Sequence, residues 1–206
     1  VALSGRDGIT QAANTVIQHT GGNASVLPIT AASTNGAVDL GQAGNGVLRV
    51  DGVNANDGIG LRGRSLDIAG DLRSSELLLE ARTGIVQTGA STIRHRTNAT
   101  TELPIAVRIL DAGDAALLNA GNGRLALATG GTSQGALAVR SDNTLRAAFD
   151  IGATGSITLR TAGELRIDAP VAAGSGTGIT LIADDMTIGA RVRAPSGVIT
   201  VQGSTA

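Results

Sequence analysis

A segment near the start of the chain recurs further along, and this repetition restricts the possible folds more than any other feature. The offset between the copies is constant from Gly8 and Gly84 to Ile29 and Ile105, and it is longer by a single position at Asn45 and Asn122. A long internal repeat of this kind is typical of solenoids, propellers and repeat arrays. The matched residues, first copy before second, are Gly8/Gly84, Ile9/Ile85, Gln11/Gln87, Ile17/Ile93, His19/His95, Leu27/Leu103, Pro28/Pro104, Ile29/Ile105, Asn45/Asn122 and Leu48/Leu125.

The apolar residues of the chain are small and aliphatic. Hydrophobic residues make up 42% of the 206 residues, which argues against disorder, yet there is no Trp, Tyr or Cys and only one Phe. A globular core of this size would normally contain several large rings. A core of Val, Ile, Leu and Ala instead suits a narrow interior built from stacked, similar layers.

Short apolar runs with period-two alternation recur along the chain and predict strands that are buried on one face. Residues 155–160, 163–168 and 178–183 are nearly interchangeable examples, each beginning with Gly. Helix is disfavoured because the 30 Gly are distributed along almost the whole chain, and an interior Gly costs a helix about 1 kcal/mol. The best helical window, residues 114–119, is too short to form an isolated helix.

The long repeat favours one all-β architecture over two others. A propeller blade would give a period of roughly 40–50 residues and an aromatic signature, and a sandwich would explain no repeat. We therefore expect a single-domain, right-handed parallel β-helix over residues 1–206, with about ten coils of roughly 19 residues and four coils per repeat. Copy one would span about 8–83, copy two about 84–160, and residues 161–206 would be a divergent remainder.

Particular positions follow from this register. Ile17 and Ile93, and likewise Leu27 and Leu103, should point inward at equivalent places. The Gly-Asn-Gly segments at 44–46 and 121–123 should form corners with positive φ. Each Leu-Pro-Ile segment lies in a less regular stretch and should mark a local edge or corner, because Pro donates no hydrogen bond; the alternative is a repeated recognition loop outside the coil.

Charge and segment patterns exclude some function classes. The net charge is −1 and the pI about 6.1, whereas a nucleic-acid footprint requires a basic cluster. No apolar run approaches the roughly 18–20 residues of a membrane helix, and no signal peptide is visible. Because the chain opens in mid-pattern, we expect it to be a piece of a longer protein.

No residue is predicted to be catalytic, to bind a cofactor or to bind a metal. His19 and His95 would lie four coils, or about 19 Å, apart, which is too far for one metal site. Three carboxylate pairs, Asp67/Asp71, Asp111/Asp114 and Asp184/Asp185, suit general acid–base or calcium chemistry by residue type. Each lies at a strand end, however, where Asp is a common turn residue.

The Gly-x-Ile/Leu-x-Leu/Ile units, clearest at residues 155–160 and 178–183, together with Ala-, Gly-, Asn- and Thr-rich corners and few aromatics, resemble filamentous haemagglutinin-like exoproteins of Gram-negative bacteria. The resemblance implies a β-helical shaft of a secreted or cell-surface adhesin, exported by two-partner secretion. It also implies flanking coils, an outer-membrane transporter and surface receptors as partners, without nucleic acid or membrane insertion. The family's Asn-Pro-Asn-Gly secretion motif is not found in this chain.

Two other functions stay open. A β-helical polysaccharide lyase or hydrolase would need a groove with three or more clustered carboxylates and a basic residue. A self-assembling surface-layer or filament subunit would associate end to end through unpaired strand edges.

Overall fold

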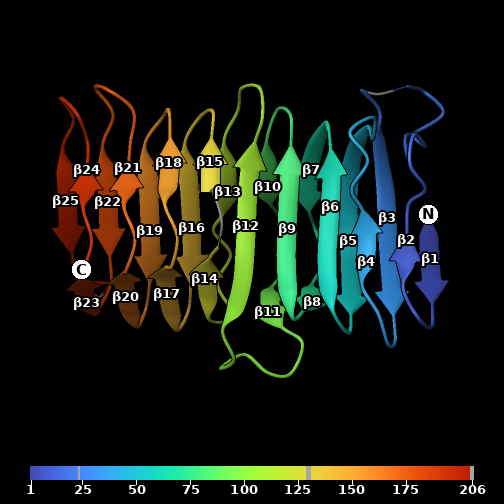
Figure 1. The fold of residues 1–206 in the computed structure, drawn as a ribbon, viewed down its shortest axis with the longest axis horizontal. Coiled ribbons are helices and arrows are strands. Elements are labelled where there is room, and N and C mark those ends of the chain that lie inside the picture. Colours follow the sequence, from blue (N-terminus) through green and yellow to red (C-terminus); the bar gives the residue numbers. More distant parts are fainter. Residues whose placement is uncertain (23, 129–130, 205–206) are drawn as a thin grey trace.

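The computed structural model describes residues 1–22, 24–128 and 131–204. Over these residues the chain forms 25 strands and no helix, and every strand pairing is parallel. The strands of successive coils stack side by side along one long axis, with the N-terminus at one end and the C-terminus at the other (Figure 1). The predicted all-β parallel β-helix is therefore confirmed.

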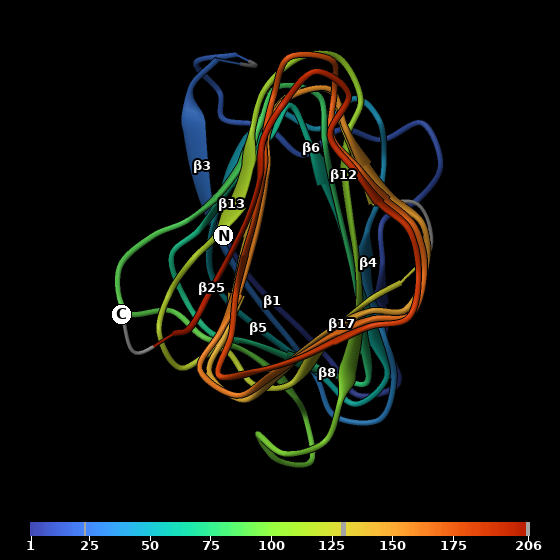
Figure 2. The same ribbon diagram turned by 90° about the vertical axis from the view of Figure 1, so that its left-hand side faces the viewer.

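Two long sheets form the walls of the coil, and a third, short sheet joins them in the C-terminal half (Figure 2). Sheet A contains β1 (Ala2–Gly5), β3 (Val26–Ser33), β5 (Val47–Ala55), β7 (Ser65–Ile68), β10 (Ile85–Gln87), β13 (Ala115–Leu117), β16 (Leu137–Ser141), β19 (Ile157–Thr161), β22 (Ile179–Ile182) and β25 (Ile199–Gln202), with β8 (Leu72–Ser74) and β11 (Ile93–His95) beside this path. Sheet B contains β2 (Ile9–Thr10), β4 (Val38–Leu40), β6 (Gly58–Gly63), β9 (Glu76–Ala81), β12 (Leu103–Ile109), β14 (Leu125–Leu127), β17 (Thr144–Ala147), β20 (Glu164–Ile167) and β23 (Asp185–Ile188). Sheet C contains β15 (Gly131–Ser133), β18 (Ile151–Ala153), β21 (Val171–Ala172) and β24 (Val192–Arg193).

The period-two pattern of the sequence places aliphatic side chains inside the coil. In β19 the inward Ile157, Leu159 and Thr161 are fully buried, while Thr158 and Arg160 face outward. Parallel pairing in register then stacks like on like, so that Ile59, Leu77, Ile105 and Leu127 form one inward row across four coils. Because each inward position is only one side chain wide, branched aliphatics fill the interior without aromatic rings.

The coils are of two lengths, and this differs from the uniform length expected from the sequence. Most coils are short, since register partners on adjacent coils are close in sequence, for example Val50 with Ile68 and Ile157 with Ile179. Two coils are longer, since Ile85 pairs with Ala115 and Ala2 with Thr30. Each long coil contains an inserted segment, described at residues 11–22 and 24–25 in the first copy and at 88–102 in the second, and the number of coils is accordingly slightly below ten.

The repeat spans about three and a half coils instead of four. Ile9 of the first copy lies in sheet B, whereas its counterpart Ile85 lies in sheet A. Leu27 and Leu103 show the reverse exchange, from sheet A to sheet B. The register prediction of four coils is therefore wrong by half a coil, because the inserted segments lengthen the coils that contain them. The two inserted segments consequently project at opposite edges of the molecule (Figure 1).

The positions predicted to point inward do so, but not at equivalent places, since Leu27 lies in sheet A and Leu103 in sheet B. Ile93 and Leu103 are fully buried, and Ile17 and Leu27 are partly buried against the same core. Pro104 pairs with Ala126 on one side, while the pairing of β12 with β9 begins only at Ile105. Proline thus lies where the preceding coil supplies no acceptor.

The Gly-Asn-Gly corners differ from the prediction. Gly121 has a φ of 88°, but Asn45 and Asn122 do not adopt positive φ. These asparagines are held by their buried side chains, as described below. Among the described residues, positive φ outside glycine occurs at Asn14 and Ser196.

One corner glycine and one strand glycine form a matched pair for testing the stacking of corners. An alanine Cβ at Gly113, where φ is 145°, would lie 1.9 Å from the carbonyl oxygen of Thr83 in the preceding coil. At Gly152 a Cβ would meet no atom within 4 Å. We expect Gly113→Ala to lower the free energy of unfolding by about 1–3 kcal/mol and Gly152→Ala to leave it almost unchanged. Equal urea-denaturation midpoints for the two variants would contradict the corner packing.

Candidate functional site

Five of the six aspartates in the three candidate carboxylate pairs serve as local hydrogen-bond acceptors or ion-pair partners. Asp71 accepts hydrogen bonds from the backbone nitrogen and hydroxyl of Thr92 at 2.9 and 2.8 Å, and lies 3.3 Å from Arg73. Asp67 accepts a hydrogen bond from the hydroxyl of Thr88. Burial raises the pKa of Asp71, but the bonds from Thr92 and Arg73 outweigh burial, so the pKa lies below its ordinary value of 3.8.

In the remaining two pairs, Asp111, Asp114 and Asp184 lie outside strands, and Asp185 is the first residue of β23. Asp111 forms an ion pair with Arg82 at 2.8 Å, and Asp114 accepts a hydrogen bond from the backbone nitrogen of Ala136 at 2.7 Å. Asp184 accepts a hydrogen bond from the hydroxyl of Ser204, and Asp185 begins β23 in an exposed position. In the described part of the chain, no three His, Cys, Asp or Glu side chains come together in a way that could hold a metal ion.

The two histidines hold equivalent places in the inserted segments, and each accepts a hydrogen bond from the backbone nitrogen two residues further along the chain. Nδ1 of His19 accepts a hydrogen bond from the backbone nitrogen of Gly21 at 2.9 Å, and Nδ1 of His95 accepts one from Thr97 at 3.2 Å. A neutral imidazole that accepts at Nδ1 carries its proton on Nε2. His19 lies between β2 and β3, and His95 ends β11, so the two histidines belong to different coils, and the segments that contain them lie at opposite edges of the molecule (Figure 1).

His95 should make stability dependent on pH. Burial and the nearby Arg96 both lower its pKa below 6.5, so the folded chain binds a proton less readily than the unfolded chain. Stability should therefore fall as the pH is lowered from 6.5 through the folded-state pKa, and His95→Gln should reduce that dependence. Thermal unfolding of both chains between neutral and mildly acidic pH measures the difference. An unchanged pH profile in the variant would contradict this assignment.

Each inserted segment is fixed by a buried pair of amide side chains, which sequence reasoning missed. Nε2 of Gln11 donates to Oδ1 of Asn45 at 2.7 Å, and Nδ2 of Asn45 donates back to Oε1 of Gln11 at 2.8 Å. In the second copy, Gln87 and Asn122 exchange the same two bonds at 2.9 and 3.0 Å. We call these two reciprocal pairs the amide clamps.

The amide clamps also satisfy the backbone of the inserted segments. Oδ1 of Asn45 accepts from the backbone nitrogen of Ile17 at 2.8 Å, and Oδ1 of Asn122 accepts from that of Ile93 at 2.9 Å. Nε2 of Gln87 donates in addition to the carbonyl oxygen of Ser91 at 2.9 Å. Side chains this well buried require such partners, because an unpaired buried amide is costly. Each clamp therefore ties the start of a segment to the apolar residue that returns it to the core.

The repeat carries a sequence signal for the clamps. Gln11/Gln87 and Asn45/Asn122 are all matched positions, and a polar residue repeated beside buried aliphatics indicates a shared structural task. The partners are 34 and 35 residues apart. Their contact depends on which corners stack, which the sequence pattern does not determine.

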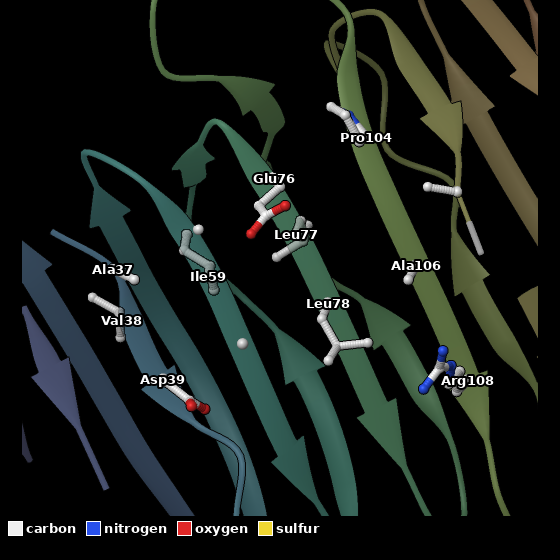
Figure 3. Close-up of a pocket in the computed structure, with 13 residues that line it drawn as sticks. Ala37, Val38, Asp39, Ile59, Glu76, Leu77, Leu78, Pro104, Ala106 and Arg108 are labelled. Atoms are coloured by element: carbon white, nitrogen blue, oxygen red, sulfur yellow. The ribbon is translucent and has the colours of Figure 1, made fainter. Parts of the chain in front are cut away.

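A shallow groove of about 420 Å³ on the outer face of sheet B is the best candidate for a binding surface (Figure 3). It crosses β4, β6, β9 and β12, and its floor is formed by small residues and by Leu78, which is 38% exposed. The outward residues that line it are Asp39, Gly58, Gly60, Glu76, Leu78, Pro104, Ala106 and Arg108.

The charges of the groove are separated by strands. Asp39 and Glu76 come from strands on either side of β6, so their Cα atoms are at least about 10 Å apart. Each carboxylate leans over a glycine of β6, because an alanine Cβ at Gly60 would lie 3.2 Å from Oδ1 of Asp39 and one at Gly58 would lie 2.9 Å from Oε1 of Glu76. This arrangement leaves an apolar floor between two hydrogen-bond acceptors.

Arg108 is engaged beside the groove. Glu80 is mostly buried and lies 2.5 Å from Arg62 and 3.8 Å from Arg108. Its carboxylate is therefore held between two guanidinium groups, one from the coil before its own and one from the coil after it. The groove therefore contains two carboxylates and one arginine that is already partly neutralised, fewer than the three clustered carboxylates expected of a sugar-cleaving β-helix.

Comparison with known proteins gave no matching family model, no similar curated protein and no similar solved structure. Among the described residues, no helix is long and apolar enough to cross a membrane.

Proposed function

We propose that this chain is a shaft segment of a secreted or surface-attached bacterial adhesin, which holds adhesive or effector regions away from the cell. The observation that supports the proposal is the unbroken parallel pairing of sheets A and B from the first coil to the last. In a solenoid each coil contacts only its neighbours, so coils can be added along one axis without changing those already present. Such a design suits a spacer whose length matters more than any single site.

Ion pairs on the outer face also suit this role. Arg146 lies 2.6 Å from Asp168 on a neighbouring coil and 3.5 Å from Glu102. The hydrogen bond with Asp168 is the main reason that the pKa of Arg146 is raised. Exposed pairs of this kind contribute little to stability individually. They keep the outer face polar between coils.

The mechanical role is tested by displaying the chain on a cell. An epitope tag is placed at the end of an outer-membrane anchor, with either this chain or a flexible Gly/Ser linker of equal length between anchor and tag. The stacked coils should hold the tag at a fixed height of roughly 45 Å, from about 4.8 Å per coil, which energy transfer to a membrane dye would report as a narrow distance distribution. A distribution as broad as that of the flexible linker would contradict the proposal.

The enzyme alternative is tested on the groove. The chain is incubated with neutral and acidic polysaccharides, and the release of reducing ends or unsaturated products is measured. The shaft proposal expects no release. Product formation that disappears in the Asp39→Asn/Glu76→Gln double variant would replace the shaft with a polysaccharide-cleaving function.

A further inference from the structure

The dipeptide Asn-Gly occurs three times, at residues 35–36, 45–46 and 122–123. Asn-Gly is chemically labile because the glycine has no side chain to hinder its own backbone nitrogen. After losing its proton to hydroxide, that nitrogen can attack Cγ of the asparagine, and the Cγ–Nδ2 bond then breaks as Nδ2 takes a proton from water and leaves as ammonia, which regenerates the hydroxide. Water then opens the cyclic succinimide to aspartate or isoaspartate. The reaction requires a movable asparagine side chain and a glycine nitrogen that can be released from its hydrogen bond.

Two of the three dipeptides lie in the amide clamps, where neither requirement is met. Asn122 is fully buried, and both its Oδ1 and its Nδ2 are bonded to Gln87. The nitrogen of Gly123 donates to the carbonyl oxygen of Ile93 at 2.9 Å, and the nitrogen of Gly46 donates to that of Ile17 at 3.0 Å. The attacking nitrogen and the attacked carbon are thus both fixed, and reaction requires local opening of the coil.

The third dipeptide lies in the exposed corner between β3 and β4. The side chain of Asn35 is exposed, and its bond to a described residue is a long one, from Nδ2 to Oδ1 of Asp7 at 3.4 Å. Gly36 is itself buried, but its nitrogen donates to the hydroxyl oxygen of Ser33 at 3.2 Å, a side chain that can rotate away, whereas the nitrogens of Gly46 and Gly123 donate to backbone carbonyls. We propose that Asn35 is a site of spontaneous deamidation, and that the amide clamps protect Asn45 and Asn122 from the same reaction.

The modification would alter the first corner of the solenoid. Conversion of Asn35 to aspartate places a second carboxylate beside Asp7, and like charges in contact repel. Isoaspartate in addition lengthens the backbone where space is small, since a Cβ at Gly36 would lie 2.3 Å from the carbonyl oxygen of Asp7. Both products should loosen the coil that contains β1 and β2, which pairs with other described strands on one side only.

The test uses the intact chain, incubated in mildly alkaline buffer and sampled over days by peptide mapping with mass spectrometry. We expect a one-dalton gain in the peptide that contains Asn35, with deamidation of Asn45 and Asn122 slower by at least about 100-fold because both require opening of a buried clamp. In urea, all three peptides should gain mass at similar rates. Equal rates in the folded chain, or modification of Asn122 before Asn35, would overturn the proposal.

Two variants separate protection by the clamp from burial in general. Gln87→Leu removes the partner of Asn122 and should raise the deamidation rate of Asn122 while leaving that of Asn35 unchanged. Asn35→Gln should abolish the early mass gain. If Gln87→Leu leaves Asn122 as slow as in the parent although the chain melts at a lower temperature, protection does not come from the clamp.

Discussion

Ile93→Asp is expected to remove more than about 4 kcal/mol from the free energy of unfolding, because a buried charge without a partner is among the costliest substitutions. Ile93 is fully buried, and the second inserted segment returns to the core at this residue. Its backbone nitrogen is bonded to Asn122, so displacement of the side chain would also strain the clamp. Urea denaturation followed by circular dichroism gives the change directly.

The first copy of the repeat supplies graded controls for this change. Ile17 occupies the equivalent position but is only partly buried, so Ile17→Asp should cost less than Ile93→Asp. Its neighbour Val16 is 50% exposed, and Val16→Asp should change stability by no more than about 0.5 kcal/mol. If all three variants melt like the parent, the inward register of both segments is wrong.

Asn122→Ala is expected to lower the free energy of unfolding by about 3–5 kcal/mol, since it leaves several buried polar groups without partners. The amide of Gln87 loses both reciprocal bonds, the backbone nitrogen of Ile93 loses its acceptor, and the carbonyl oxygen of Arg140 loses a donor at 3.1 Å. The matched control is Asn54→Ala, because Asn54 is an exposed residue of β5.

A double variant distinguishes lost pairing from lost packing. In Gln87→Leu/Asn122→Leu both amides are replaced by apolar groups, so neither is left orphaned. The loss in the double variant should be smaller than the sum of the two single losses, with a coupling of roughly 0.5–3 kcal/mol. Additive losses would mean that the two amides do not stabilise the fold as a pair.

The sequence predicted the architecture well because the signal is local and repeated. Alternation such as Ile157, Leu159 and Thr161 specifies which face is buried, and the small aliphatic composition excludes a ring-filled core. Parallel pairing of like residues then follows from stacking. The prolines at 28 and 104 lie where the strand is in register with the next coil only, as the missing N–H of proline predicts, but both belong to the regular strands β3 and β12 and not to loops.

The errors came from features that depend on the closed coil. The length of a coil could not be obtained by dividing the repeat into four equal parts, because the two coils that contain the inserted segments are longer than the others. The second segment adds only the short strand β11, and its remaining residues form the loop that projects from the coil between β11 and β12 (Figure 1). Asn45 and Asn122 were assigned to positive φ by residue type, whereas burial against Gln11 and Gln87 determines their conformation. The groove on sheet B was not predicted, because it arises where Gly58 and Gly60 happen to lie between longer side chains on neighbouring coils.

Because the repeat ends half a coil short of a whole number of coils, successive copies of it present their inserted segments in different directions. A unit that ends after a whole number of coils places each copy directly above the last, as in simple translation. A unit of three and a half coils instead relates its copies by an approximate two-fold screw axis along the stack, which exchanges the two sheets at every step. Tandem copies built by this rule would present their inserted segments alternately on opposite sides, so a flat surface approaching from one side would meet only every second segment.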